Sequence, residues 1–139
     1  MAEMMLPRLM ITAPGSGTGK TTMVCGLLKA LMNKGLSVAA FKSGPDYIDP
    51  MFHSRVIGAK SRNLDLFMLG EDTARMLVAK NAAHVDVAVF EGAMGFYDGM
   101  GKTTEASAYA LACACDTPVV LVVNGKGAAL SIAAMIKGF

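Results

Sequence analysis

The segment best suited to chemistry is the glycine-rich run Pro14-Gly-Ser-Gly-Thr-Gly-Lys-Thr21, which follows an apolar stretch and precedes a helical pattern. Glycines let backbone amides curl around an anion, and the start of a helix adds its positive dipole end. In such a phosphate-binding loop the lysine reaches the β- and γ-phosphates, and the last threonine hydroxyl can ligate Mg²⁺. The expected nucleotide-binding residues are Gly15, Ser16, Gly17, Thr18, Gly19, Lys20, Thr21 and Thr22. A plain glycine-rich turn is the alternative, and the flanking strand and helix argue against it.

Acidic side chains follow two further apolar stretches. Glu91 ends one of them, and Asp98 lies in the glycine-rich segment that comes next. Asp46 and Asp49 belong to Lys42-Ser-Gly-Pro-Asp-Tyr-Ile-Asp-Pro-Met-Phe-His53, which follows the other. If the strands are parallel, their carboxyl ends meet at one sheet edge and bring these groups to the phosphate loop. On composition alone, Asp and Pro are also ordinary turn residues.

Alternating strands and helices must position these residues. Short apolar runs predict strands at 9–13, 36–41, 85–90 and 118–123, and helical spacing predicts helices over 20–33, 72–83, 104–114 and 128–137. We expect Asp72 to cap the second helix and residues 44–62 to form a long irregular loop. The alternation predicts an α/β fold, a parallel sheet with helices on both faces.

The composition of the chain favours one ordered domain. Of 139 residues, 53% are hydrophobic and 17% charged, which excludes a disordered chain, and the net charge of +2 gives no reason to expect nucleic acid or a membrane surface as partner. Residues 106–123, the most apolar stretch, are broken by Asp116 and Pro118, so no membrane span is expected. Three cysteines, Cys25, Cys113 and Cys115, are too few for a disulfide framework. We expect them to be buried thiols of a cytoplasmic protein.

Three segments resemble the cobyrinic acid a,c-diamide synthase family. They are Lys42 to His53, Arg62-Asn-Leu-Asp65 and Glu91-Gly-Ala-Met-Gly-Phe-Tyr-Asp-Gly99. The phosphate loop, with Pro14 where the strict pattern has glycine, is similar to that family too. So is 117–124, although Asn124 stands where the family usually has Asp. The wider P-loop superfamily includes dethiobiotin synthetase and the ATPases of chromosome partitioning, and it implies the strand order 2-3-1-4.

The resemblance implies an ATP-dependent carbon–nitrogen ligase of cobalamin biosynthesis. Such an enzyme amidates the a and c acetate side chains of a corrinoid through an acyl phosphate, with ATP and Mg²⁺. Its nitrogen comes from glutamine, hydrolysed in a separate amidotransferase domain, or from ammonia. The similarity begins near Arg8 and runs to the end of the chain, and family members are several times longer. We therefore expect 1–139 to be the N-terminal ATP-binding part, without the amidotransferase domain.

The resemblance also implies a division of roles among the site residues. Lys20 would neutralise the transferred phosphate, and Lys42 would pair with phosphate or substrate. Asp49 and Asp98 would lie where ATP meets the corrinoid carboxylate, and Asp46 would complete the metal shell or orient the substrate. The expected catalytic residues are Lys20, Lys42, Asp46, Asp49 and Asp98, and the expected metal ligands are Thr21, Glu91 and Asp46.

Several alternatives remain open from the sequence. The same chemistry could act on a nickel-containing or metal-free tetrapyrrole. A dethiobiotin synthetase-like carboxylating enzyme is disfavoured by residues 44–53, and a dimeric partitioning switch by Gly15, where such switches often have a second lysine. A nucleotide-binding module without turnover is a further possibility. The fourth strand would be an open apolar edge, so we expect self-association or poor solubility.

Overall fold

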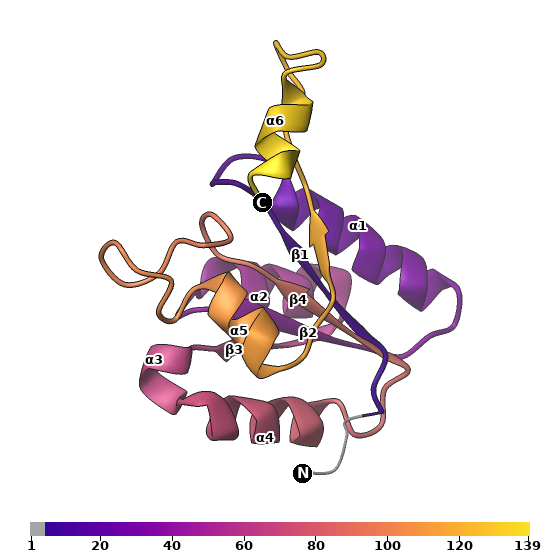
Figure 1. Ribbon diagram of the computed structural model, residues 1–139. Coiled ribbons are helices and arrows are strands. Elements are labelled where there is room, and N and C mark those ends of the chain that lie inside the picture. The colour runs from indigo at the N-terminus through magenta and orange to yellow at the C-terminus, as the bar shows by residue number, and fades with distance from the viewer. Residues whose placement is uncertain (1–4) are drawn as a thin grey trace.

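The computed structural model describes residues 5–139, which form an α/β fold (Figure 1). The strands are β1 (Arg8–Thr12), β2 (Val38–Ser43), β3 (Lys60–Leu64), β4 (Val87–Glu91) and β5 (Val119–Leu121). The helices are α1 (Lys20–Asn33), α2 (Ile48–Phe52), α3 (Leu66–Leu69), α4 (Glu71–Asn81), α5 (Ala108–Ala114) and α6 (Ile132–Lys137), with a π-helical turn, η1 (His53–Ile57), before β3. Within the described residues the strands form a five-stranded sheet in the order β3-β2-β4-β1-β5, with every pair parallel.

Helices cover both faces of the sheet, as predicted. Figure 1 shows α1 on one side of the strands and α4 with α5 on the other. Water is thereby excluded from both faces, and all six residues of β2 are buried. This burial explains why the central strands are continuous apolar runs rather than alternating ones.

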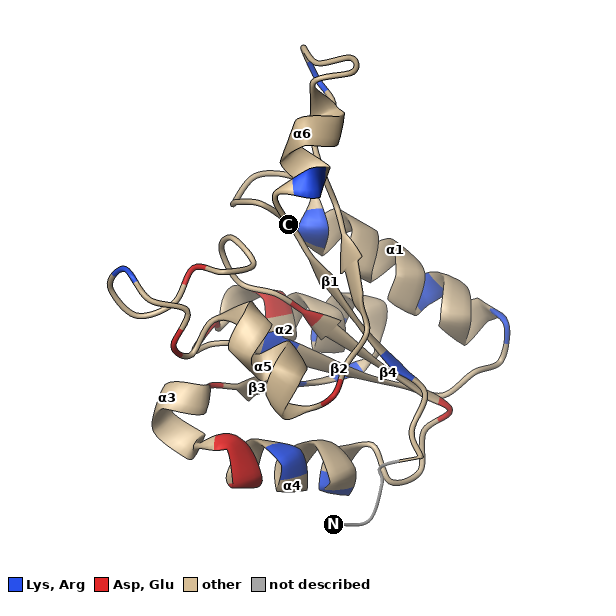
Figure 2. Ribbon diagram, viewed as in Figure 1, with Lys and Arg blue, Asp and Glu red and all other residues tan. Residues whose placement is uncertain are grey.

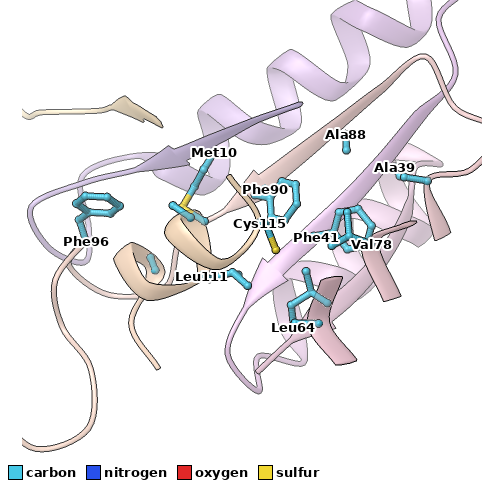
Figure 3. Packing of buried hydrophobic residues seen from close by; sticks show 14 residues of the cluster. Met10, Ala39, Phe41, Leu64, Val78, Ala88, Phe90, Phe96, Leu111 and Cys115 are labelled. Carbon is cyan, nitrogen blue, oxygen red and sulfur yellow. The ribbon is translucent and has the colours of Figure 1, made fainter. Parts of the chain in front are cut away.

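The larger core lies between the sheet and the helices α4 and α5 (Figure 3). Phe41 of β2 and Phe90 of β4 pack there with ring centroids 5.0 Å apart, and Leu111 of α5 and Val78 of α4 cover them. On the opposite face, α1 contributes side chains that include Val24, which is fully buried. Side chains alternate along a strand, so the residue after Phe90 points to the α1 face. That residue is Glu91.

The four predicted strands correspond in chain order to β1, β2, β4 and β5. Their predicted order in the sheet, 2-3-1-4, is therefore β2-β4-β1-β5, which the structure confirms, with β3 added outside β2. The prediction of an irregular loop over 44–62 was wrong, because the segment contains α2, η1 and the start of an outer strand, β3. β3 reads Lys-Ser-Arg-Asn-Leu, and a polar edge strand carries no apolar run to reveal it. The turn before α2 is held by Asp46, whose Oδ1 accepts the Ile48 amide at 2.9 Å.

Some local predictions need correction. Asp72 does not cap α4; the helix starts at Glu71 after Gly70, and Asp72 lies in its first turn. α5 begins at Ala108 rather than 104, because the Ser107 hydroxyl accepts the Ala110 amide and caps it. α6 begins at Ile132 rather than 128. Of the cysteines, Cys115 is buried as expected, whereas Cys113 is exposed and Cys25 is half-buried.

The described helices are too short to span a membrane. The longest described helix, α1, has 14 residues, and a bilayer span needs about 20. Across residues 5–139 we find no helix able to cross a membrane. β5 forms one edge of the sheet, as expected, with Val119 and Val120 exposed.

Candidate nucleotide and metal site

The candidate site lies at the carboxyl ends of β1, β2 and β4. The parallel register sets Lys42 of β2 directly beside Glu91 of β4, and Glu91 beside Ile11 of β1. β1 then leads through the glycine-rich loop into α1. Two central strands and the start of one helix therefore bring a buried carboxylate, a buried lysine and the phosphate loop together, as the sequence predicted.

The phosphate loop lines a cavity of about 480 Å³. Gly17 and Gly19 adopt φ angles of 75° and 95°, a conformation that side chains disfavour, so these two glycines let the loop turn into α1. Lys20 is buried, and its Nζ donates to the carbonyl oxygens of Gly15 at 3.1 Å and Met94 at 2.8 Å. Burial and the nearby positive charge of Lys42 lower the pKa of Lys20. The positive charge of Lys20 and the backbone amides at the start of α1 make this an anion site, and the two carbonyl oxygens hold the lysine in place.

Glu91 is completely buried and uses both oxygens. Oε1 accepts from the Thr21 hydroxyl at 2.6 Å and from Lys42 Nζ at 3.1 Å, while Oε2 lies 2.9 Å from His53 Nε2. Burial acts to raise the pKa of Glu91, but the hydrogen bonds from His53 and Thr21 and the charge of Lys42 outweigh it and lower the pKa to about 2. Glu91 is therefore an ionised carboxylate at the base of the cavity.

Lys42 joins the acidic groups of the site. Its Nζ lies 2.6 Å from Asp49 Oδ2, 3.1 Å from Glu91 Oε1 and 3.5 Å from Asp46 Oδ2. Burial acts to lower the pKa of Lys42, but the hydrogen bond to Asp49 and the charge of Glu91 raise it above its ordinary value. Figure 2 shows acidic positions on α2 and at the end of β4 around this point. The lysine is charged, and it neutralises carboxylates that would otherwise repel each other.

Oxygen donors suitable for Mg²⁺ converge beside the phosphate loop. The Thr21 hydroxyl is bonded to Glu91 and lies 3.4 Å from Asp49 Oδ2. Within residues 5–139 no group of three or more His, Cys, Asp or Glu side chains is arranged to hold a metal alone. Mg²⁺ usually takes one or two carboxylates and completes its shell with water and substrate phosphates. The donor set therefore fits a magnesium ion carried with a nucleotide.

A second cavity, of about 560 Å³, adjoins the first at Asp46, Ala93 and Met94. Most of its lining is apolar, and Asp98 lies on its wall. Asp98 Oδ2 accepts the Gly95 amide at 2.8 Å, which fixes the loop that follows Glu91. Of the predicted catalytic residues, Asp98 lines this second cavity and not the first, although its charge still acts on Lys20.

The loop after Glu91 is packed tightly against the phosphate loop. The Phe96 amide donates to Ala13, and a Cβ built at Gly95 would lie 2.6 Å from the Pro14 carbonyl oxygen and 2.5 Å from Asp98 Oδ2. Met94 has a φ of 51°, which is unusual for a residue other than glycine. Glycine at 95 thus allows the two loops to touch.

Gly95→Ala is expected to lower the free energy of unfolding by about 1–3 kcal/mol, because the backbone oxygen of Pro14 must move away. Gly26→Ala, in the middle of α1 with open space around it, is the matched control and should stabilise by about 0.5–1 kcal/mol. Urea denaturation of the two variants checks both values. Equal unfolding free energies for the two would show that the loops are not in close contact.

Comparison with known proteins identifies this arrangement. Residues 9–91, from β1 through Glu91, match the family model described as the CobQ/CobB/MinD/ParA nucleotide binding domain. The chain belongs to this family. That family is described as a nucleotide-binding domain, so this chain is a nucleotide-binding domain.

Curated proteins are similar to this chain over nearly its whole length. The cobyrinate a,c-diamide synthase of Thermoplasma volcanium is 46% identical over 136 residues, which cover 98% of this chain and 30% of that protein. The Priestia megaterium protein of the same name is 45% identical, over 95% of this chain and 29% of its own length. The hydrogenobyrinate a,c-diamide synthase of Streptomyces coelicolor is 45% identical, over 96% and 28%. The chain spans about 30% of the relatives' length.

The sequence did not assign His53 a role, although it lies in one of the motif segments. It is fully buried, against Glu91, at the start of η1. The segment after the second predicted strand puts His53 at the same sheet edge as the phosphate loop, but nothing in the spacing predicts contact with a residue 38 positions away. The carbonyl of Met94 as a partner of Lys20 was likewise outside the predictions.

Proposed function

We propose that this chain is the ATP- and Mg²⁺-binding part of an enzyme that amidates acetate side chains of a cobyrinate-type tetrapyrrole. The observation that carries this proposal is the group of Thr21, Lys42, Asp49 and Glu91 beside Lys20 of the phosphate loop, in which Lys42 and Glu91 are buried. Proteins named for this reaction on cobyrinate and on hydrogenobyrinate share 45–46% identity with the chain. Enzymes named for the two rings are about equally similar to the chain. The proposed substrate is therefore the class of cobyrinate-type tetrapyrroles and not one member of it.

The chemistry explains why such a reaction needs this group. A carboxylate does not react with ammonia directly. When its oxygen attacks the γ-phosphorus of ATP, ADP leaves and an acyl phosphate forms; ammonia then attacks the carbonyl carbon and phosphate leaves. The protein's task is positioning and neutralising charge, as in other phosphoryl transfers. In this scheme Lys20 holds the transferred phosphate, and Lys42 steers the substrate carboxylate to it.

The metal in this proposal is held by Thr21 and Glu91, with Asp49 nearest to them. Bound there, Mg²⁺ would supply positive charge to the phosphate oxygens. Asp46, the carboxylate that the sequence suggested, already accepts the amides of Ile48 and Asp49 with one oxygen. We therefore assign Asp49 to the metal side of the cavity and Asp46 to the substrate side.

The second cavity is our candidate for the acetate-bearing edge of the ring. It is largely apolar, as the body of a tetrapyrrole requires, and it meets the phosphate cavity at Asp46 and Met94. Asp98 would then face the substrate, as the resemblance implied. We take ammonia, released from glutamine by an amidotransferase domain, as the nitrogen donor. We assign the reaction to the cytoplasm, where thiols such as Cys113 stay reduced.

The experiment that tests the proposal measures ADP release by this chain with Mg²⁺-ATP, ammonia and cobyrinate, with hydroxylamine added to trap an acyl phosphate. We expect ADP release that requires cobyrinate, and a hydroxamate product. A dimeric nucleotide switch is the second candidate, favoured by the exposed edge strand β5 with Val119 and Val120. ADP release without cobyrinate, rising with protein concentration, would support the switch and contradict amidation.

Asp49→Asn is expected to lower cobyrinate-dependent turnover by about 100-fold while leaving the affinity for ATP without Mg²⁺ within about threefold of the wild type. The amide keeps the shape but loses the charge that lies 2.6 Å from Lys42 and beside Thr21. Steady-state kinetics and calorimetry check the two quantities. Asp72→Asn, on the exposed first turn of α4, is the control. Unchanged turnover in Asp49→Asn would remove it from the site.

A further inference from the structure

Among the described residues of the site, His53 is the one histidine, and each of its ring nitrogens has a close polar neighbour. Nδ1 lies 3.2 Å from the Ser61 hydroxyl of β3, and Nε2 lies 2.9 Å from Glu91 Oε2. Its backbone carbonyl accepts the Ala59 amide at 3.0 Å. The side chains of His53 and Glu91 are both 0% exposed. A fully buried imidazole with two polar partners has little freedom to turn.

The two oxygens of Glu91 face different surroundings. Oε1 points to the cavity side, where it accepts from Thr21 and Lys42. Oε2 points inward to His53. An ionised carboxylate can only accept hydrogen bonds, so the 2.9 Å contact is favourable only when Nε2 carries a proton, and a small rotation of either group would align it as a hydrogen bond. The Ser61 hydroxyl can donate or accept, so it satisfies Nδ1 in either protonation state of the ring.

We infer that His53 is a positioning residue, which holds the Glu91 carboxylate so that Oε1 faces the Mg²⁺-nucleotide site. This inference rests on the proposed function, because it needs Glu91 to serve the metal. Ligand carboxylates are commonly oriented by hydrogen bonds from outer partners, whose loss typically costs 10–100-fold in metal affinity. Glu91 Oε2 is buried and has no other hydrogen-bond donor among the described residues, so without the 2.9 Å contact to His53 the carboxylate would turn towards donors elsewhere.

The location of His53 explains why a histidine is suited to this role. It starts η1, on the sheet face that α1 covers, and Glu91 ends β4 on the same face. The imidazole ring contacts Ser61 of the outer strand β3 with one nitrogen and Glu91 of β4, the second strand from β3, with the other. β2 lies between them and contributes Lys42 to the other oxygen of the same carboxylate. The carboxylate is thus held from two sides.

The test compares His53→Gln with His53→Asn in this chain. A glutamine amide can reach the position of Nε2 and donate to Glu91, whereas an asparagine amide reaches only the position of Nδ1 and the Ser61 contact. Calorimetry measures the affinity for ATP with Mg²⁺ and with EDTA. We expect His53→Gln to bind Mg²⁺-ATP within about threefold of the wild type and His53→Asn to bind it 10–100-fold more weakly. With EDTA, we expect all three proteins to bind ATP equally.

Other outcomes would overturn the inference in distinguishable ways. Equal Mg²⁺-ATP affinity in both variants would mean that His53 does not orient Glu91. An equal loss with Mg²⁺ and with EDTA would mean that His53 only supports the fold, and thermal melting would report the same damage. Glu91→Gln in the same series tests the underlying proposal. If this variant binds Mg²⁺-ATP as the wild type does, Glu91 does not serve the metal, and the proposed site fails together with the role of His53.

Discussion

Replacing Glu91 with glutamine is expected to lower the Mg²⁺-dependent affinity for ATP by at least about 100-fold, because the loss of an outer partner alone typically costs 10–100-fold. Glutamine has nearly the same shape, and its single carbonyl oxygen can still accept from Thr21. Lys42 keeps its ion pair with Asp49 at 2.6 Å, so no buried charge is left without a partner. The substitution therefore removes charge from the metal site while it preserves the packing. Calorimetric titration of ATP with and without Mg²⁺ measures the effect.

The matched control for this prediction is Glu71→Gln. Glu71 has a side chain that is 64% exposed and forms an i,i+4 pair with Arg75 on α4, on the face of the sheet opposite α1. Such a pair contributes at most about 0.5 kcal/mol, and it lies far from the nucleotide site. ATP affinity should therefore be unchanged. If the two variants bound Mg²⁺-ATP equally well, the buried carboxylate would have no part in holding the nucleotide.

Acid is expected to destabilise the protein through the same carboxylate. The pKa of Glu91 falls from an ordinary value of 4.5 to about 2 in the folded chain, so the folded state binds its proton less readily than the unfolded state. A lowered pKa contributes stability that is complete above the unfolded value and is lost as the pH falls towards the folded value. The difference corresponds to about 3 kcal/mol, and roughly half of it should be gone at pH 3.

Urea denaturation at several pH values isolates this contribution. The difference in unfolding free energy between the wild type and Glu91→Gln should shrink by about 1–2 kcal/mol between pH 6 and pH 3, since glutamine does not titrate. The same series with Glu71→Gln should run parallel to the wild type. Parallel curves for Glu91→Gln would mean that its carboxylate is not held ionised by Thr21, His53 and Lys42.

The sequence predicted the parts of the fold that depend on local patterns. α1 was expected over Lys20–Asn33 and is found there, because a phosphate loop before it and Gly35 after it define both ends. The apolar central strands were equally clear. β3 was missed because an edge strand needs no apolar run, and its pairing with β2 depends on residues distant in the sequence. Long-range pairing has no local signal.

The sequence could predict which residues gather at the candidate site, but it could not predict which of their atoms are in contact. The carboxyl ends of parallel strands were expected to meet, and Lys42 of β2 is paired with Glu91 of β4. The choice between Asp46 and Asp49 depends on where α2 begins, and Asp46 uses one oxygen to start that turn. The contact between His53 and Glu91 depends on the π-helical turn η1, which no pattern in the sequence indicated.

The measurement that tests the central claim most directly is Mg²⁺-dependent ATP binding to this chain, with Lys20→Ala beside it. Lys20 Nζ is buried at the phosphate cavity and is the only lysine of the loop itself. We expect the wild type to bind Mg²⁺-ATP and Lys20→Ala to bind it at least about 100-fold more weakly, the loss expected for a buried charge contact of roughly 3 kcal/mol. Circular dichroism should find both proteins equally folded. Equal binding by the two folded proteins would contradict a nucleotide site at this loop.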